Sequence, residues 1–237
     1  MPQLKGRDRA VWAIAFAAAA ASVAAGAVVG GRSYVVVSAV VVLCAIVPCF
    51  VRFERRRPQA REVVMLAVLC ALAVAARVAF VWLPHFKPML GIIMIAGMAF
   101  GASPGFLVGS LSALVSNFIF GQGPWTPWQM LAYGVCGLVF GLLANGGFVR
   151  GRLGAGKLLA VSIAGGLFVV AVAGPILDTS SLFFMVSSIT PESALAVYGA
   201  GFPVNLMHGA ATTVTILLLA NPLLGKLARV KGKYGMF

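Results

Sequence analysis

Acidic side chains are scarce in this chain. Its 237 residues include only 5 Asp and Glu, and charged residues of both signs make up 10%. Soluble globular domains carry about 25% charged residues, and no compact soluble fold of this size could bury the 61% of residues that are hydrophobic. The composition therefore excludes a soluble domain and predicts an all-α polytopic membrane protein. A spanning helix needs about 20 residues, so about eight spans leave no room for a large soluble domain.

Sequence signatures of ATP use and of catalysis are missing as well. The chain has no GxxxxGK[ST] loop, no HExxH and no glycine-rich dinucleotide motif. Its four cysteines lie inside apolar runs without CxxC spacing, so we interpret them as buried small hydrophobic residues. We therefore expect no enzyme activity, no cofactor and no metal, and any energy for its work must come from another protein.

Basic residues are the abundant charged class, with 18 Lys and Arg and a formal charge of +13. In a soluble protein this charge would suggest nucleic acid as a partner. Here the cations cluster at the ends of apolar runs, which is the positive-inside pattern of a membrane protein. Nucleic acid is therefore not an expected partner, and both termini are predicted to be cytoplasmic. The clusters are Lys5, Arg7 and Arg9; Arg52, Arg55, Arg56, Arg57 and Arg61; Arg150, Arg152 and Lys157; and Lys226, Arg229, Lys231 and Lys233.

Apolar runs between helix breakers predict eight membrane helices. We interpret the first as a retained helix and not a signal peptide, because a second apolar run follows almost at once. A composition break then predicts an N-terminal transmembrane hairpin with a basic linker at 1–61 and a six-helix substrate-binding core at 62–237. The expected helices are 10–30, 33–52, 63–83, 88–101, 105–120, 127–147, 158–177 and 201–221, with a long outer segment at 178–200.

Polar residues of the core gather at the predicted outer ends of its helices, whereas the inner halves are nearly all apolar. A channel or pump would need polar groups through its whole thickness, so the pattern predicts a ligand-binding site open to the outside. The candidate residues are Arg77, His85, Lys87, Asn117, Gln122, Trp125, Thr126, Trp128, Gln129, Asp178, Asn205 and His208.

Several candidates also have ordinary structural interpretations. Trp125 and Trp128 lie in a loop stiffened by two prolines and suit stacking on a ring-shaped ligand, but they fit an interfacial aromatic belt as well. Asp178 could cap a following helix, and Arg77 could extend along its own helix to the interface. Asn205 and His208 could bond neighbouring helices instead of a ligand.

Small residues recur on the third predicted helix, where Ala67, Ala71 and Ala75 follow four-residue spacing. Such spacing leaves a flat strip against which another helix can pack closely. Arg77 falls on a different face of the same helix. One face therefore suits a helical partner and another suits the ligand site, although ordinary internal packing would also explain the alanines.

Four stretches resemble the substrate-binding S components of energy-coupling factor (ECF) transporters. They are 85–109; 116–130, which contains GQGPWTPWQ; 201–209; and 231–235. The resemblance covers 62–237 and is to the cobalamin-type S components in particular. The N-terminal hairpin departs from the family's six-helix core.

The resemblance implies the substrate-specific subunit of an ECF-type ABC importer in the bacterial cell membrane. Such a subunit captures a vitamin at the outer face, here cobalamin as the first candidate, with riboflavin, a queuosine precursor or a pterin-like ligand as alternatives. It docks through Ala67, Ala71 and Ala75 onto a T component that is attached to two ATPase subunits. A stand-alone secondary transporter or channel competes with this interpretation, but it predicts a coupling carboxylate and internal repeats within the spans. A membrane-embedded enzyme, with a nucleophile paired to His85 or His208, is the third interpretation.

Overall fold

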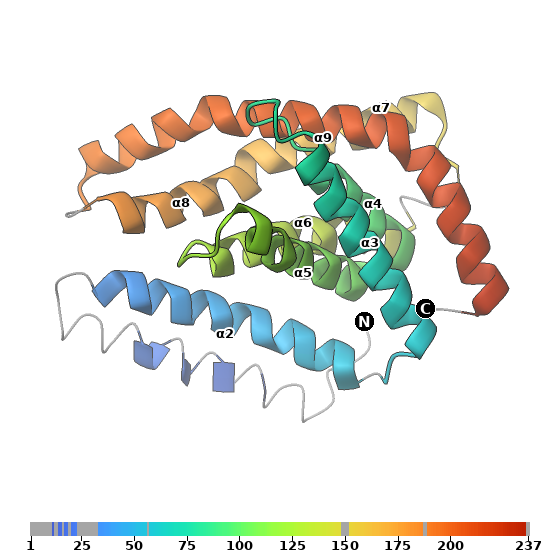
Figure 1. Ribbon diagram of the computed structural model, residues 1–237, viewed down its shortest axis with the longest axis horizontal. Helices are drawn as coiled ribbons and strands as arrows, with labels where there is room; N and C mark the ends of the chain where they lie inside the picture. The colour runs from blue at the N-terminus through green and yellow to red at the C-terminus, as the bar shows by residue number, and fades with distance from the viewer. Residues whose placement is uncertain are drawn as a thin grey trace.

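The chain is described by a computed structural model that covers residues 11, 14–15, 17–18, 20–22, 33–55, 57–147, 152–186 and 189–235. Regular structure in these ranges is entirely helical, which confirms the all-α polytopic prediction (Figure 1). The helix expected at 10–30 falls largely outside the described residues. The elements are α2 (Ser33–Arg55), α3 (Ala60–Ala79), α4 (Met89–Phe100), α5 (Ala102–Phe120), α6 (Thr126–Asn145), α7 (Ala155–Phe168), the π-helical η1 (Val169–Ala173), α8 (Gly174–Met185) and α9 (Pro191–Tyr234).

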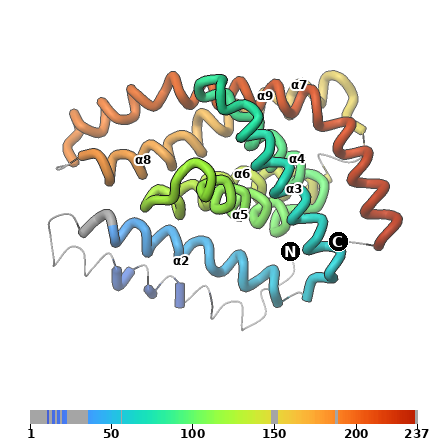
Figure 2. The backbone as a smooth tube through the Cα atoms, viewed as in Figure 1, coloured from blue at the N-terminus to red at the C-terminus, as the bar shows by residue number. Residues whose placement is uncertain are grey.

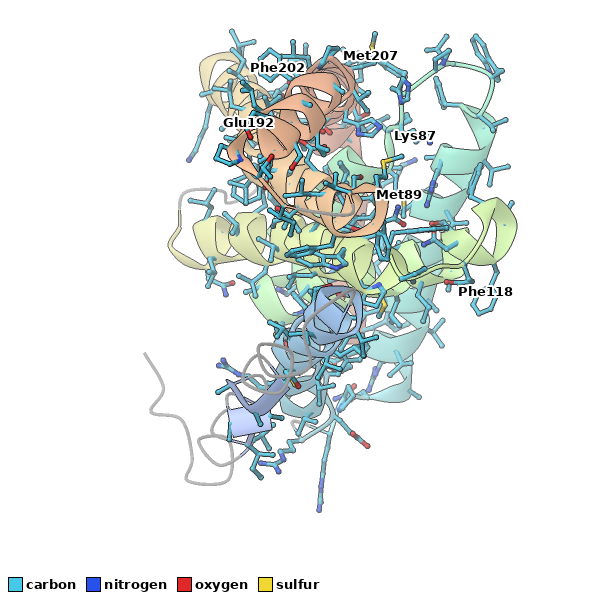
Figure 3. All side chains as sticks on the ribbon, turned by 90° about the vertical axis from the view of Figure 1, so that its left-hand side faces the viewer. Lys87, Met89, Phe118, Glu192, Phe202 and Met207 are labelled. Carbon is cyan, nitrogen blue, oxygen red and sulfur yellow. The ribbon has the colours of Figure 1, made fainter. Side chains whose placement is uncertain are left out.

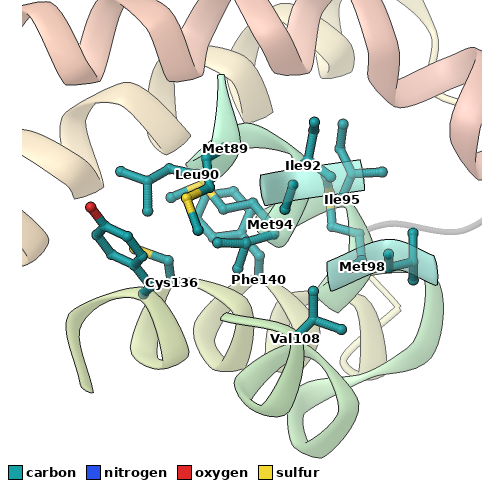
Figure 4. Packing of buried hydrophobic residues seen from close by; sticks show 14 of the residues in the cluster. Met89, Leu90, Ile92, Met94, Ile95, Met98, Val108, Cys136 and Phe140 are labelled. Atoms are coloured by element: carbon teal, nitrogen blue, oxygen red, sulfur yellow. The ribbon is translucent and has the colours of Figure 1, made fainter. Parts of the chain in front are cut away.

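The short helix α4 lies at the centre of the bundle. All of its residues except Ala99 are buried, and α3, α5, α6 and α9 pack around it (Figure 4). Its 12 residues rise about 18 Å, less than the roughly 30 Å of a bilayer core. The expectation of a short fourth helix is therefore confirmed. Within the described ranges, six other helices are long and apolar enough to cross a membrane.

The predicted boundaries near the C-terminus are wrong. Residues 178–200 were expected to form a long outer segment, but α7, η1 and α8 make one helical span of 31 residues, Ala155–Met185. Helix α9 then runs for 44 residues and contains both Pro203 and Pro222. Membrane helices tolerate internal proline because neighbouring groups satisfy the freed carbonyls. Helix α8 consequently lies beside the first half of α9 (Figures 1 and 2).

Helices α5 and α6 approach each other through glycine. A methyl group on Gly137 would overlap the backbone of Gly105, and one on Gly109 would overlap the backbone at Tyr133. Small residues at such contacts let two membrane helices touch along their backbones. The end of α5 is thereby held beside the start of α6, where most of the polar candidates lie.

The two ends of the molecule differ in charge. The α5–α6 loop, the end of α8 and the start of α9 lie on the left in Figure 1, and we call this the site end. The α2–α3 linker, the start of α7 and the end of α9 lie on the right. These right-hand segments carry the basic clusters that fall within the described residues.

Helix α2 packs directly on the six-helix core. Its Val42 and Ile46 are buried against Phe106 of α5, and Trp128 and Met130 of α6 adjoin this cluster. Phe50 also meets the ring of Phe106 edge to face at 6.4 Å. The division into a hairpin and a core stays a prediction, but α2 is in close contact with the core.

Candidate functional site

Arg77 is turned into the bundle from the last turn of α3. Its Nη1 donates to Ser116 Oγ at 2.5 Å and to Asn117 Oδ1 at 3.0 Å. The guanidinium also lies over the Phe120 ring, 4.4 Å from its centroid. Only 7% of the side chain is exposed, and its Nε has no hydrogen-bond partner among the described residues. The alternative in which Arg77 extends to the interface is therefore wrong.

Asn117 is the centre of a hydrogen-bond network at the site end. Its Nδ2 donates to Gln129 Oε1 at 2.7 Å and to Thr126 Oγ1 at 3.1 Å. Thr126 in turn donates to Gln122 Oε1 at 2.9 Å, and Gln122 Nε2 donates to the Leu114 carbonyl at 3.0 Å. These bonds order the α5–α6 loop and fix both oxygen and nitrogen of the Asn117 amide.

The loop itself depends on one glycine conformation. Helix α5 ends at Gly121, whose φ of 103° lies in the region that favours glycine. Pro127 then occupies the first turn of α6, where its missing N–H costs no helical hydrogen bond. The sequence prediction of a stiff loop at this point agrees with this geometry.

The two tryptophans of the loop differ in their surroundings. Trp125 is 42% exposed and meets the ring of Phe184 edge to face at 6.3 Å. Trp128 is partly buried, with its ring 5.8 Å from that of Phe183. The Trp128 Nε1 is buried and has no partner in the described parts of the chain. An aromatic belt explains Trp125, but an interfacial indole would keep its N–H in contact with water or lipid headgroups, unlike that of Trp128.

Lys87 lies near Arg77, and the two histidines lie near each other. The Lys87 amine is 5.7 Å from the centroid of the Phe120 ring that Arg77 also contacts. Burial lowers the pKa of Lys87 below its ordinary value, and the charge of Arg77 lowers it further. The rings of His85 and His208 are 6.1 Å apart, and His208 Nε2 is buried without a partner among the residues described.

Asp178 and Asn205 bond to each other. Asn205 Nδ2 donates to Asp178 Oδ2 at 2.7 Å, which joins α8 to α9. Two glycines make room for the pair, since a methyl group on Gly174 would overlap Asn205 and one on Gly201 would overlap Asp178. Helix α8 begins four residues before Asp178, so the interpretation of Asp178 as a helix N-cap is wrong.

The alanine strip of α3 faces away from the other helices. Ala67, Ala71 and Ala75 are all exposed, whereas Arg77 on another face of the helix is buried. Ordinary internal packing therefore does not explain the strip. Its role in docking stays a prediction.

The comparisons with known proteins agree with this architecture. Residues 58–228 match the family model described as ECF-type riboflavin transporter, S component. The chain belongs to this family. This S component is thus a bacterial membrane protein and the substrate-binding subunit of a vitamin transporter, and not an enzyme. The preference for cobalamin that the sequence suggested has no support from the family match.

The S component is also similar to a UPF0397 protein from Vibrio atlanticus (strain LGP32). It is 30% identical over 145 residues, which are 59% of this chain and 77% of the relative. No solved structure matches the chain. The family match begins two residues before α3, so α2 lies outside it.

Side-chain contacts bring most of the predicted residues of this S component into two groups. Arg77, Asn117, Gln122, Thr126 and Gln129 share one network. Lys87 adjoins it through Phe120, and the Asp178–Asn205 pair is separate. Sequence reasoning missed Ser116, Phe120, Phe183 and Phe184. Their signal was weak, because a serine or phenylalanine in an apolar run looks like ordinary core.

Proposed function

We propose that this S component captures riboflavin or a closely related flavin at the site end. The observation that best supports this proposal is the hydrogen-bond network of Arg77, Asn117 and Gln129, next to Trp128, whose Nε1 is buried and unpartnered among the described residues. A flavin has a flat ring system that stacks on aromatic side chains, and ring carbonyls that accept hydrogen bonds. The aromatic pairs around Trp125 and Trp128 supply the first requirement, and the Trp128 indole N–H supplies a donor for the second.

The internal hydrogen bonds favour a flavin over cobalamin. Cobalamin was considered because its amide-rich periphery would need many free polar side chains. The amides of Asn117 and Gln122 are engaged within the protein, and the Asn205 amide donates to Asp178. Fewer groups remain for a large amide-rich ligand. Cobalamin is therefore the second candidate.

The charge distribution supports an outward-facing site. Basic segments collect at the end of the molecule opposite to the site end, and such segments are retained on the cytoplasmic side. The site end then faces outside, where a nutrient arrives. The exposed alanine strip of α3 is the proposed contact for the T component, with two ATPase subunits supplying the energy for release inward.

Ligand binding to the purified protein in detergent tests the proposal. We expect riboflavin to bind saturably, to quench tryptophan fluorescence and to raise the unfolding temperature, because a ligand of the folded state stabilises it. Trp128→Ala should weaken binding by at least about tenfold, which corresponds to roughly 1.4 kcal/mol. Trp82→Ala is the matched control, since Trp82 is 72% exposed in the α3–α4 turn.

Two other outcomes of the binding experiment would change the proposal. Stabilisation by cobalamin alone would replace riboflavin with the second candidate. Stabilisation by neither, or an equal effect of both tryptophan substitutions, would contradict the proposed site.

A further inference from the structure

Basic side chains from three parts of the chain meet beside the flavin site. Arg77 comes from α3, His85 and Lys87 from the α3–α4 connection, and His208 from α9. Arg77 and Lys87 share the Phe120 ring, at 4.4 and 5.7 Å from its centroid. The ring of His208 lies 6.1 Å from that of His85, two residues before Lys87. In the end-on view, Lys87 lies close to α9, whereas Phe118 lies on the outer side of α5 (Figure 3).

No carboxylate balances this cluster within the described part of the chain. Glu54 and Glu62 belong to the end of α2 and the start of α3, and Glu192 is exposed at the start of α9. Asp178 is engaged by Asn205. Arg77 and Lys87 contact the neutral side chains of Ser116, Asn117 and Phe120. Buried cations without counter-charge are costly in a membrane protein and mark functional sites.

Donors in the cluster remain available. Arg77 is 93% buried, because only 7% of it is exposed, and its Nη1 is held by Ser116 and Asn117. These two hydrogen bonds fix the orientation of the guanidinium plane. The Nε of Arg77 has no partner among the described residues. His208 Nε2 is likewise buried and unpartnered there. The site thus holds an oriented guanidinium with one N–H group that has no partner in the described chain.

We infer that Arg77, Lys87 and His208 form a subsite for an anionic group, a phosphate or carboxylate, carried by the transported ligand. The inference rests on the proposed function, and for a flavin the group would be the 5′-phosphate of FMN at the end of its side chain. Asn117 links the two regions, because it accepts from Arg77 and donates to Gln129, the neighbour of Trp128. A ligand can therefore place its ring at the tryptophans and its anion at the cations. A bound anion also offsets the two causes that lower the Lys87 pKa.

The first test needs no vitamin. The full chain in detergent is unfolded thermally in pyrophosphate and in chloride at equal ionic strength, as wild type, Lys87→Gln and Lys226→Gln. Lys226 is an exposed cation of α9 far from the cluster and controls for general salt effects. We expect pyrophosphate to stabilise the wild type and Lys226→Gln equally, and Lys87→Gln much less. Equal stabilisation of all three would overturn the inference.

The second test compares FMN with riboflavin on the same three proteins. We expect FMN to bind at least about tenfold more tightly to the wild type, with that ratio retained in Lys226→Gln and reduced at least about fivefold in Lys87→Gln. Equal or weaker binding of FMN would overturn the subsite even if riboflavin binds. Pyrophosphate stabilisation without binding of either flavin would retain the subsite and contradict the proposed ligand.

A lipid headgroup presents the same phosphate chemistry. The FMN titration is therefore repeated with phosphatidylglycerol added to the detergent micelles. Loss of the FMN advantage under those conditions would assign the cations to lipid and overturn the inference, whereas an unchanged ratio supports a subsite for the transported ligand.

Discussion

Arg77 of α3 donates a 3.0 Å hydrogen bond to Asn117 of α5, and the same helix exposes Ala67, Ala71 and Ala75 on another face. The helix proposed to dock with the T component is thus bonded directly to the proposed ligand site. Displacement of α3 on docking would pull on Asn117, which also holds the α5–α6 loop through Gln129 and Thr126. Docking and ligand release can therefore be coupled through one side chain.

Asn117→Ala should weaken ligand binding and destabilise the protein. The change leaves Arg77, Thr126 and Gln129 without a shared partner, and each unsatisfied buried group costs about 1–3 kcal/mol. We expect at least a tenfold loss of riboflavin affinity together with a lower unfolding temperature. Asn145→Ala, at the exposed far end of α6, is the control. Unchanged affinity in Asn117→Ala would show that the network is not part of the site.

Ala71→Trp should abolish ATP-driven uptake and leave binding intact. A bulky side chain on the exposed strip prevents close approach of a partner helix but fills no space inside this bundle. Uptake in vesicles with the T component and ATPases, and copurification with the T component, are the measurements. Ile163→Trp, on the 45% exposed position of α7, should affect neither. If Ala71→Trp also loses ligand binding, the strip has a structural role instead.

Asn205→Leu should destabilise the protein more than the double substitution Asp178→Leu with Asn205→Leu. The single change leaves the Asp178 carboxyl without its donor, whereas removing both polar partners can be nearly neutral. We expect a difference of about 1–3 kcal/mol in the free energy of unfolding. A double-substitution cycle measures it. Riboflavin affinity in the double variant then shows whether the pair also contacts ligand.

FMN affinity should fall as the pH rises through the lowered pKa of Lys87. The charged amine attracts phosphate, and burial with the nearby Arg77 charge makes the amine lose its proton below its ordinary pKa. In the alkaline range the phosphate is already fully charged and does not change its charge further. The decline in that range should therefore vanish in Lys87→Gln. An identical decline in Lys87→Gln would attribute it to another group.

The same shift predicts the pH dependence of stability. The pKa of Lys87 is lower in the folded state than in the unfolded state, so the charged amine destabilises the fold below the folded pKa. This cost is relieved as the pH rises from the folded pKa toward the unfolded value. Relative to Lys87→Gln, the wild type without ligand should gain stability in that window. A loss of relative stability there would contradict the burial of Lys87.

Removal of residues 1–57 should preserve ligand binding and lower stability. The family match starts at residue 58, but Val42 and Ile46 are each only 3% exposed against the core. The loss of that packing should lower the unfolding temperature, because van der Waals contacts between membrane helices contribute to their association. Riboflavin titration and thermal unfolding of the truncated chain are the measurements. A folded truncation that no longer binds ligand would place α2 within the site.

The sequence predicted well which polar residues of the helices would be buried together, because a polar side chain in hydrocarbon must find a hydrogen-bond partner. Arg77, Asn117 and Gln129 had to find polar partners because hydrocarbon offers none, and they found one another. The start of the last helix was predicted wrongly at residue 201, because α9 begins ten residues earlier at Pro191 and continues through Pro203. Thr190 caps that start by accepting from the Ser193 backbone N–H.

The ligand was harder to predict than which polar residues contact one another. The amides of Gln122 and Asn205 looked available for a ligand, but the structure engages them with Leu114 and Asp178. Which polar side chains bond to one another depends on how each helix is rotated about its axis and how deep it lies in the membrane. The pattern of apolar residues in the sequence defines neither quantity to better than one helical turn. Phe183 and Phe184 were missed for the related reason that their segment was expected outside the helices.

The glycine contact between α5 and α6 has a consequence for how the helices can move relative to one another. Backbones that touch at Gly105 and Gly137 have no side chains between them to repack, so the two helices move as one body. Helices α3 and α9 reach the site by long side chains, chiefly Arg77 and His208, which can change rotamer. If the proposed site opens, we therefore expect α3 and α9 to shift relative to α5 and α6.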